Sequence, residues 1–230
     1  MMNKRIPAAI YRRVSRLLNG KRDESVLVPM DAVNTARLLY FRSLLEKTRA
    51  VPGDIVECGV GHGRSLLTMS LLVKVEGDKR NLWAFDSFQG FPAPAAEDAS
   101  PRNPQRGEYA ISLPFVTATL DRHLADEQFL RSRVTLVKGF FEETLPRYPH
   151  AAISLLNLDV DLYQSYKTCL EFFWPKLSIG GIVTFDEFVR ESHNFPGGEQ
   201  AIREFFADKR VEFQRDPSYG KYYVVKTAGT

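Results

Sequence analysis

The sequence has few cysteines and no long apolar run, and both absences narrow the class of protein. Only two of its 230 residues are cysteine, Cys58 and Cys169, which excludes a disulfide framework and favours buried thiols in a reducing compartment. No uninterrupted apolar stretch approaches the ~20 residues that a membrane-spanning helix needs, and residues 1–20 interleave basic with apolar side chains, unlike a secretory signal. We therefore expect a cytoplasmic protein without a transmembrane segment.

The first 22 residues contain no acid. They carry a charge of +7, whereas the whole chain has a net charge of +3, so the remainder carries −4. A slightly acidic body argues against a nucleic-acid partner. Within this basic arm, Ile6, Ile10, Val14 and Leu17 fall at the spacing of an amphipathic helix. We expect the arm to pack on the body or to join subunits of a homo-oligomer, with an anionic membrane surface or organelle targeting as the alternatives.

Beyond residue 50, short apolar runs alternate with helix-length stretches, which is typical of parallel βαβ units. The predicted strands are Ile55–Glu57, Leu82–Asp86, Val134–Lys138, Ile153–Asp159 and Gly181–Asp186, and the predicted helices are Ala32–Thr48, Arg64–Val75, Phe115–Glu127, Tyr163–Trp174 and Glu199–Asp208. Two last runs, Val211–Arg215 and Lys221–Lys226, predict a closing antiparallel hairpin. The predicted fold class is α/β, a doubly wound, mostly parallel, seven-stranded sheet in residues 51–230, preceded by a helical arm in residues 1–50.

Residues 87–114 show neither the helical nor the strand spacing of apolar residues. They contain five prolines, at positions 92, 94, 101, 104 and 114. The stretch is too long for an ordinary connection and follows a strand at the edge of the sheet where ligands bind. We expect a lid or substrate loop, and a disordered insertion is the alternative.

A glycine-rich segment, Glu57-Cys58-Gly59-Val60-Gly61-His62-Gly63-Arg64-Ser65, joins the first predicted strand to a helix. Its glycines allow close approach of the backbone to a ligand, and its amides can face that ligand, so the segment predicts a nucleotide-type site, with a simple tight turn as the alternative. The dinucleotide fingerprint requires glycine where Arg64 stands, which argues against NAD. Asp86 ends the next strand, where it can accept hydrogen bonds from both hydroxyls of a ribose with help from Ser87.

Paired acids follow two later strands: Asp159 with Asp161, and Asp186 with Glu187. Adjacent strand ends would bring these like charges together, which is unfavourable without a cation or protons. Hard oxygen donors suit Mg²⁺, Ca²⁺ or Mn²⁺. We predict a divalent metal held by Asp159, Asp186 and Glu187, and helix caps with solvated carboxylates are the alternative.

Two of the four histidines are candidate general bases. His62 lies inside the glycine segment and His193 follows the second acidic pair, so each can reach a substrate at this edge. A structural role is the alternative for both. We assign catalysis to His193 and to Asp159 as proton acceptor.

The motifs E-x-G-x-G-x-G, F-D-S, Val137–Pro146, L-D-x-D-L-Y and F-D-E-F occur in an order that resembles the macrocin O-methyltransferase (TylF-type) family, from about Val51 to Phe206. The resemblance implies a class I methyltransferase fold that uses S-adenosylmethionine. It also implies Mg²⁺-dependent methyl transfer to a hydroxyl of a sugar or glycosylated natural product.

The resemblance assigns cofactor contacts in three groups: Glu57, Gly59 and Ser65 at the methionine end, Asp86 and Ser87 at the ribose, and Gly139 and Phe140 at the adenine; Gly61 and Asp161 complete the predicted cofactor site. Asp159 and Asp186 match the family's metal ligands, and Glu187 stands where relatives more often have Asp. His62 departs from a Trp-Arg-Gly that relatives often carry. A catechol-like diol acceptor, a nicotinamide-dependent oxidoreductase and a non-catalytic nucleotide-binding module remain the alternatives.

Overall fold

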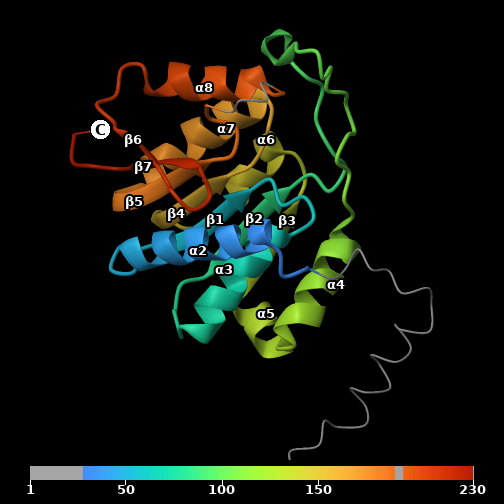
Figure 1. Cartoon of the computed structure of the whole chain (residues 1–230), viewed down its shortest axis with the longest axis vertical. Coiled ribbons are helices and arrows are strands. Elements are labelled where there is room, and N and C mark those ends of the chain that lie inside the picture. The colour runs from blue at the N-terminus through green and yellow to red at the C-terminus, as the bar shows by residue number, and fades with distance from the viewer. Residues whose placement is uncertain (1–27, 190–193, 230) are drawn as a thin grey trace, which may run out of the picture.

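The computed structural model describes residues 28–189 and 194–229 (Figure 1). The basic arm and His193 lie outside these residues. The helices are α2 (Ala32–Lys47), α3 (Arg64–Val75), α4 (Leu113–Leu124), α5 (Glu127–Arg133), α6 (Phe141–Thr144), α7 (Tyr163–Phe173) and α8 (Pro196–Phe206), with short 3₁₀ turns η2 (Ala96–Asp98), η3 (Leu145–Arg147) and η4 (Trp174–Lys176). The strands are β1 (Asp54–Cys58), β2 (Leu82–Asp86), β3 (Val134–Lys138), β4 (Ile153–Leu158), β5 (Leu177–Phe185), β6 (Phe213–Arg215) and β7 (Tyr222–Val225).

The seven strands form one sheet in the order β3-β2-β1-β4-β5-β7-β6. The pairs from β3 to β5 are parallel, and β7 pairs antiparallel with both β5 and β6. The predicted mostly parallel α/β sheet and its closing hairpin are therefore confirmed. Because the chain order reverses between β1 and β4, the carboxyl ends of these strands form a crevice in which ligands bind in such sheets.

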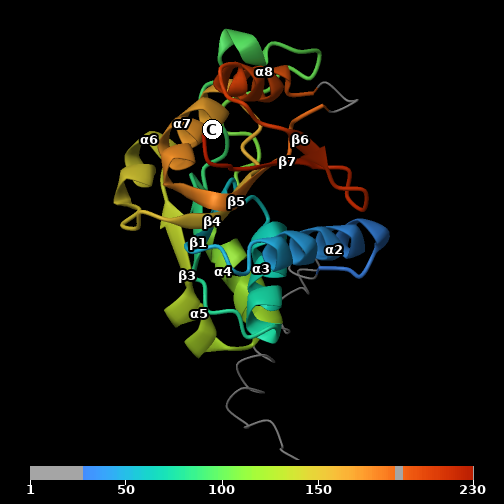
Figure 2. The same ribbon diagram turned by 90° about the vertical axis from the view of Figure 1, so that its left-hand side faces the viewer.

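Helices cover both faces of the sheet, and Figure 2 shows α6 and α7 on one side with α2 and α3 on the other. Alternate strand residues point to opposite faces, so two apolar cores form. One packs α7 and α8 on Val56, Leu156 and Val183, and the other packs α2, α3 and α4 on Ile55, Leu155 and Ile182. Cys58 and Cys169 are buried and not disulfide-bonded, as predicted.

The predicted helix Phe115–Glu127 is two helices, α4 and α5. Ala125 adopts a left-handed conformation with φ 49° and ends α4. The carboxylate of Asp126 then accepts a hydrogen bond from the amide of Phe129 at 3.0 Å and caps α5. The sequence prediction missed this capping signal because the apolar period continues across the break.

The predicted helix Glu199–Asp208 begins earlier, at Pro196, because its first-turn glycines are packing residues and not a loop. A Cβ on Gly197 would collide with Asp98, and one on Gly198 would lie 2.6 Å from the carbonyl oxygen of Asp161. These glycines let α8 approach the start of α7 closely. Strand β5 also begins before its predicted start, at Leu177.

Residues 87–112 form a long connection with its own hydrogen bonds, seen in green in Figure 1, and α4 begins inside the predicted lid at Leu113. The amide of Phe91 donates to the carbonyl of Glu108 at 2.9 Å, and the amide of Gly107 donates to the carbonyl of Phe91 at 3.0 Å. Asp98 fastens the connection to α7 by accepting from the amide of Tyr163 at 2.8 Å. No helix in the described ranges has the length and apolar character needed to cross a membrane.

Candidate active site

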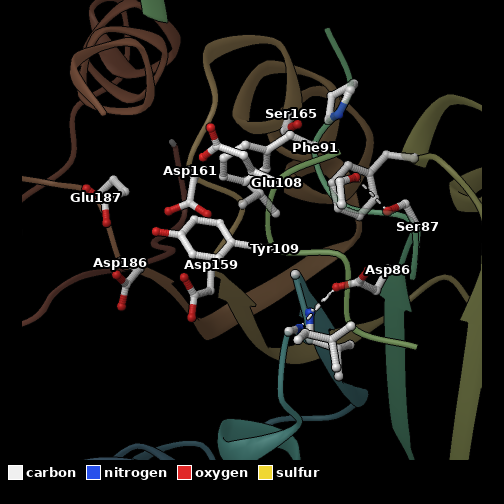
Figure 3. Close-up of a pocket in the computed structure, with 18 of the residues that line it drawn as sticks. Asp86, Ser87, Phe91, Glu108, Tyr109, Asp159, Asp161, Ser165, Asp186 and Glu187 are labelled. Atoms are coloured by element: carbon white, nitrogen blue, oxygen red, sulfur yellow. Dashed lines mark hydrogen bonds between the residues drawn. The ribbon is translucent and has the colours of Figure 1, made fainter. Parts of the chain in front are cut away.

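A cavity of about 450 Å³ opens at the carboxyl ends of the parallel strands (Figure 3). Its walls come from the loops after β1, β3, β4 and β5 and from the long connection after β2. Eleven residues predicted for the site line it: Gly59, Gly61, Ser65, Asp86, Ser87, Gly139, Phe140, Asp159, Asp161, Asp186 and Glu187. The sheet topology thus brings together motifs that are about 130 residues apart in the chain.

Gly59 allows the loops after β1 and β4 to touch. Its φ is +83°, and a Cβ there would overlap the carbonyl oxygen of Asp159. A backbone hydrogen bond holds this contact, in which the amide of Asp159 donates to the carbonyl of Cys58 at 2.9 Å. The amide of Gly59 donates to the carbonyl of Phe85 in β2 at 3.0 Å and so fixes the loop to the neighbouring strand. The glycine is therefore required both by its backbone angle and by close packing.

Asp86 organises the glycine loop. Its Oδ2 accepts hydrogen bonds from the amides of Val60 at 2.8 Å and Gly61 at 3.1 Å, and its Oδ1 accepts from the amide of Phe88 at 2.6 Å. Ser87 turns back on its own loop and donates to the carbonyl of Gly90 at 2.8 Å. Ribose binding by these two residues therefore stays a prediction, alongside an evident structural role.

Glu57 lies behind the glycine loop and does not line the cavity. The residue is 1% exposed, and its Oε1 accepts a hydrogen bond from the side-chain amide (Nδ2) of Asn157 at 2.9 Å. Its Oε2 is buried without a hydrogen-bond partner in the described structure. Burial raises the pKa of Glu57 to about 8, because the charged form loses its hydration there.

The acidic side chains gather on one side of the cavity. Figure 3 shows Asp159, Asp161 and Asp186 directed into the same region, with Glu187 beside them. Burial, followed by the charges of Asp186 and Asp161, raises the pKa of Asp159 well above its usual range. The ammonium of Lys221 contacts Asp186 and partly offsets this effect on Asp159.

These residues fit a divalent cation by donor chemistry, since carboxylate oxygens are hard ligands and a cation would relieve the repulsion around Asp159. Within the ranges that the structure describes, however, no three His, Cys, Asp or Glu side chains are arranged closely enough to hold a metal. Lys221 lies in contact with one of the predicted ligands. Metal binding here would require these side chains to draw together.

The connection after β2 contributes residues that the motif analysis did not single out. Phe91, Glu108 and Tyr109 line the cavity, and the ring of Phe91 packs edge-on against Tyr109 with centroids 5.2 Å apart. In Figure 3 the ring of Tyr109 reaches over the region of Asp159. Only the absence of a regular period in this segment pointed to it.

His62 also lines the cavity, and its ring packs edge-on against Phe115 with centroids 5.9 Å apart. Partial burial and the charge of Arg64 lower the pKa of His62, which favours the neutral imidazole that a general base requires. The other histidine candidate, His193, lies outside the described residues.

The fold and the glycine loop define a class I methyltransferase architecture. Residues 13–214 match the family Macrocin-O-methyltransferase (TylF), and the chain belongs to this family.

Relatives that match this chain are named as O-methyltransferases. The chain is 37% identical over 145 residues to 8-demethyl-8-(2,3-dimethoxy-alpha-L-rhamnosyl)-tetracenomycin-C 4'-O-methyltransferase of Streptomyces olivaceus, a match that covers 60% of this chain and 54% of that protein. It is 29% identical to Mycinamicin III 3''-O-methyltransferase of Micromonospora griseorubida, over 74% of this chain and 68% of that one. The match thus spans about half the length of the first relative.

Solved structures agree with the fold over most of the chain. CalS11, a calicheamicin methyltransferase, superposes with a TM-score of 0.75 at 27% identity and covers 97% of this chain and 94% of its own. The O-methyltransferase NovP superposes with a TM-score of 0.69 at 28% identity, covering 84% and 80%.

Proposed function

We propose that this protein is an S-adenosylmethionine-dependent O-methyltransferase that acts, with Mg²⁺, on a hydroxyl of a sugar or glycosylated natural product. The observation that carries the proposal is that the glycine loop and the group of carboxylates line the same cavity. Family membership and relatives named as methyltransferases of rhamnosyl and mycinamicin compounds support the reaction and the acceptor class.

Different residues of the cavity are assigned to cofactor binding and to the acceptor. The loop that Asp86 holds would bind the cofactor, with Gly139 and Phe140 on the adenine side. Because the sulfonium already makes the methyl group electrophilic, the protein has to align the acceptor and remove its proton. Asp159 is the proposed proton acceptor, because its carboxylate lines the cavity at the carboxyl end of β4.

Asp159, Asp186 and Glu187 are the proposed ligands of Mg²⁺. When bound, the ion would supply Lewis-acid chemistry that orients two neighbouring hydroxyls and lowers their pKa. The connection over the cavity, with Phe91 and Tyr109, would shape the acceptor pocket and limit access of water. A catechol-like diol offers the same pair of hydroxyls and is the second acceptor class to test.

The test is incubation with labelled S-adenosylmethionine and Mg²⁺ against a panel of glycosides and catechols, with mass detection of the product. We expect a labelled glycoside, complete loss of transfer in EDTA and recovery with added Mg²⁺. Asp186→Ala should lose activity, whereas Asp121→Ala on the exposed face of α4 should keep it. Full activity of Asp186→Ala in chelator would overturn the metal role, and cofactor binding without any turnover would point to a non-catalytic module.

A further inference from the structure

A second cavity, of about 410 Å³, lies beneath α2 next to the first one. It is enclosed by α2, the carboxyl ends of β4 and β5, and the turn between β6 and β7. Four residues line both cavities: Arg37, Ser65, Asp159 and Asp186. These residues therefore mark the junction through which the two spaces meet.

The guanidinium of Arg37 lies at this junction, and one of its nitrogens lacks a hydrogen-bond partner. Its Nη1 donates to Asn34 one turn earlier on α2, and its guanidinium lies 5.7 Å from the ring centroid of Tyr219. Its Nε is buried and has no hydrogen-bond partner in the described structure. A buried donor without a partner is costly, so Arg37 points to an absent acceptor at this junction.

Ser65 supplies a second donor to the same junction. It is in the first turn of α3, directly after the glycine loop, where the helix N-terminus favours negative charge. A guanidinium together with a hydroxyl at a helix N-terminus is complementary to a carboxylate.

These two groups match the carboxylate at the α-amino acid end of S-adenosylmethionine. We propose that the guanidinium of Arg37, with the hydroxyl of Ser65, binds the α-carboxylate of the cofactor's methionine moiety. The proposal rests on the proposed function, because it takes S-adenosylmethionine as the cofactor. In this proposal α2 is part of the cofactor site. Through Arg37 it distinguishes ligands that carry the amino acid end from nucleosides that lack it.

The experiment compares two ligands that differ in this group. S-adenosylhomocysteine has the amino acid end, whereas 5'-methylthioadenosine has the same thioadenosine core without it. Dissociation constants for both are measured by calorimetric titration on the wild-type protein, Arg37→Met and Arg37→Lys. Arg42→Met is the matched control, since Arg42 is on the same helix but is 61% exposed and pairs with Glu76.

Arg37→Met should weaken S-adenosylhomocysteine about 10- to 100-fold, the range expected for one charge-assisted hydrogen-bonding group, and leave 5'-methylthioadenosine unchanged. Arg37→Lys should fall between wild type and Arg37→Met, because it keeps the charge but loses the planar fork. Arg42→Met should bind both ligands as the wild type does.

Equal weakening of both ligands by Arg37→Met would overturn the proposal, because it would indicate a structural role; melting curves without ligand would show the same loss. Unchanged affinity for S-adenosylhomocysteine would also overturn it. If the wild-type protein bound neither ligand, the proposed function itself would fail. The two failures are therefore distinguishable.

Discussion

At the scale of single residues, Gly59 gives the sharpest test of how the cofactor loop is built. Alanine at this position would require an unfavourable positive φ and would drive its Cβ into the carbonyl of Asp159. The strands β1 and β4 would have to separate at the point where both loops face the cavity. We expect Gly59→Ala to lose at least about tenfold in affinity for S-adenosylhomocysteine, since a displacement that costs ~1.4 kcal/mol of binding suffices.

Gly77→Ala is the control for backbone strain alone. Gly77 has a φ of +65°, but a Cβ there meets nothing within 4 Å, and it lies outside the residues that line the cavity. Titration calorimetry should find its cofactor affinity unchanged. Wild-type affinity in Gly59→Ala would show that the loops tolerate separation and that close packing is not what defines the site.

The site residues that could be predicted are those whose place is marked by the neighbouring sequence. Gly59, Asp86, Asp159 and Asp186 each directly follow or end an apolar run, so periodicity alone places them at one edge of the sheet. Arg37 has no such signal: it is one of 31 basic residues and lies on a helix whose sequence gives no reason to face a ligand. Its role depends on tertiary packing, which no local pattern encodes.

At the scale of elements, the connection after β2 is fastened to α7 by one buried carboxylate. Asp98 is 1% exposed; its Oδ1 accepts from the amide of Tyr163 and its Oδ2 from the amide of Ala95, each at 2.8 Å. Asp98→Ala would leave both amides without this acceptor, at a cost of about 1–3 kcal/mol each. We expect lower stability and a raised KM for the acceptor, with little change in cofactor affinity.

Thermal melting and steady-state kinetics with the methylated acceptor would check this expectation. Glu97→Ala is the matched control, because Glu97 is the neighbouring acid in the same turn and is less buried. An unchanged KM in Asp98→Ala would show that this fastening does not shape the acceptor pocket.

Elements with a strong period were predicted well, and those that depend on packing were not. Arg64–Val75 and Leu82–Asp86 have the predicted bounds, because each has an unbroken apolar pattern with clear ends. The start of α8 was wrong by three residues, since Gly197 and Gly198 indicate a loop unless the close approach of α7 is known. Local propensity was overridden there by a tertiary contact.

At the scale of the whole molecule, the site draws on the full length of the described chain. Arg37 near its start and Lys221 near its end meet at the same cavity, although 183 residues lie between them. The N-terminal helix and the C-terminal hairpin are therefore parts of the site and not mere additions to the sheet. Changes in α2 or in the turn between β6 and β7 should therefore affect ligand binding as well as stability.

The role of the basic arm, residues 1–22, concerns the assembly of the whole molecule. Beside it in the chain, the described structure has three exposed apolar side chains, Met30, Val33 and Leu39, with exposures of 85%, 57% and 52%. These exposed apolar side chains follow the arm in the chain and offer surface that a protein contact would bury. We propose that residues 1–22 join subunits of a homo-oligomer, and we expect their deletion to lower the oligomeric state in sedimentation velocity while cofactor affinity is kept.

A second variant separates the apolar stripe of the arm from its charge. Replacing Ile10, Val14 and Leu17 by serine keeps the +7 charge of residues 1–22 but removes the apolar face that would pack against a partner. If burial of that face drives assembly, this variant should dissociate as the deletion does, because each buried aliphatic side chain contributes about 1.5–3 kcal/mol. If only the deletion variant dissociates, the basic charge of the arm and not its apolar face drives assembly. If the oligomeric state is unchanged in both variants, the arm does not join subunits.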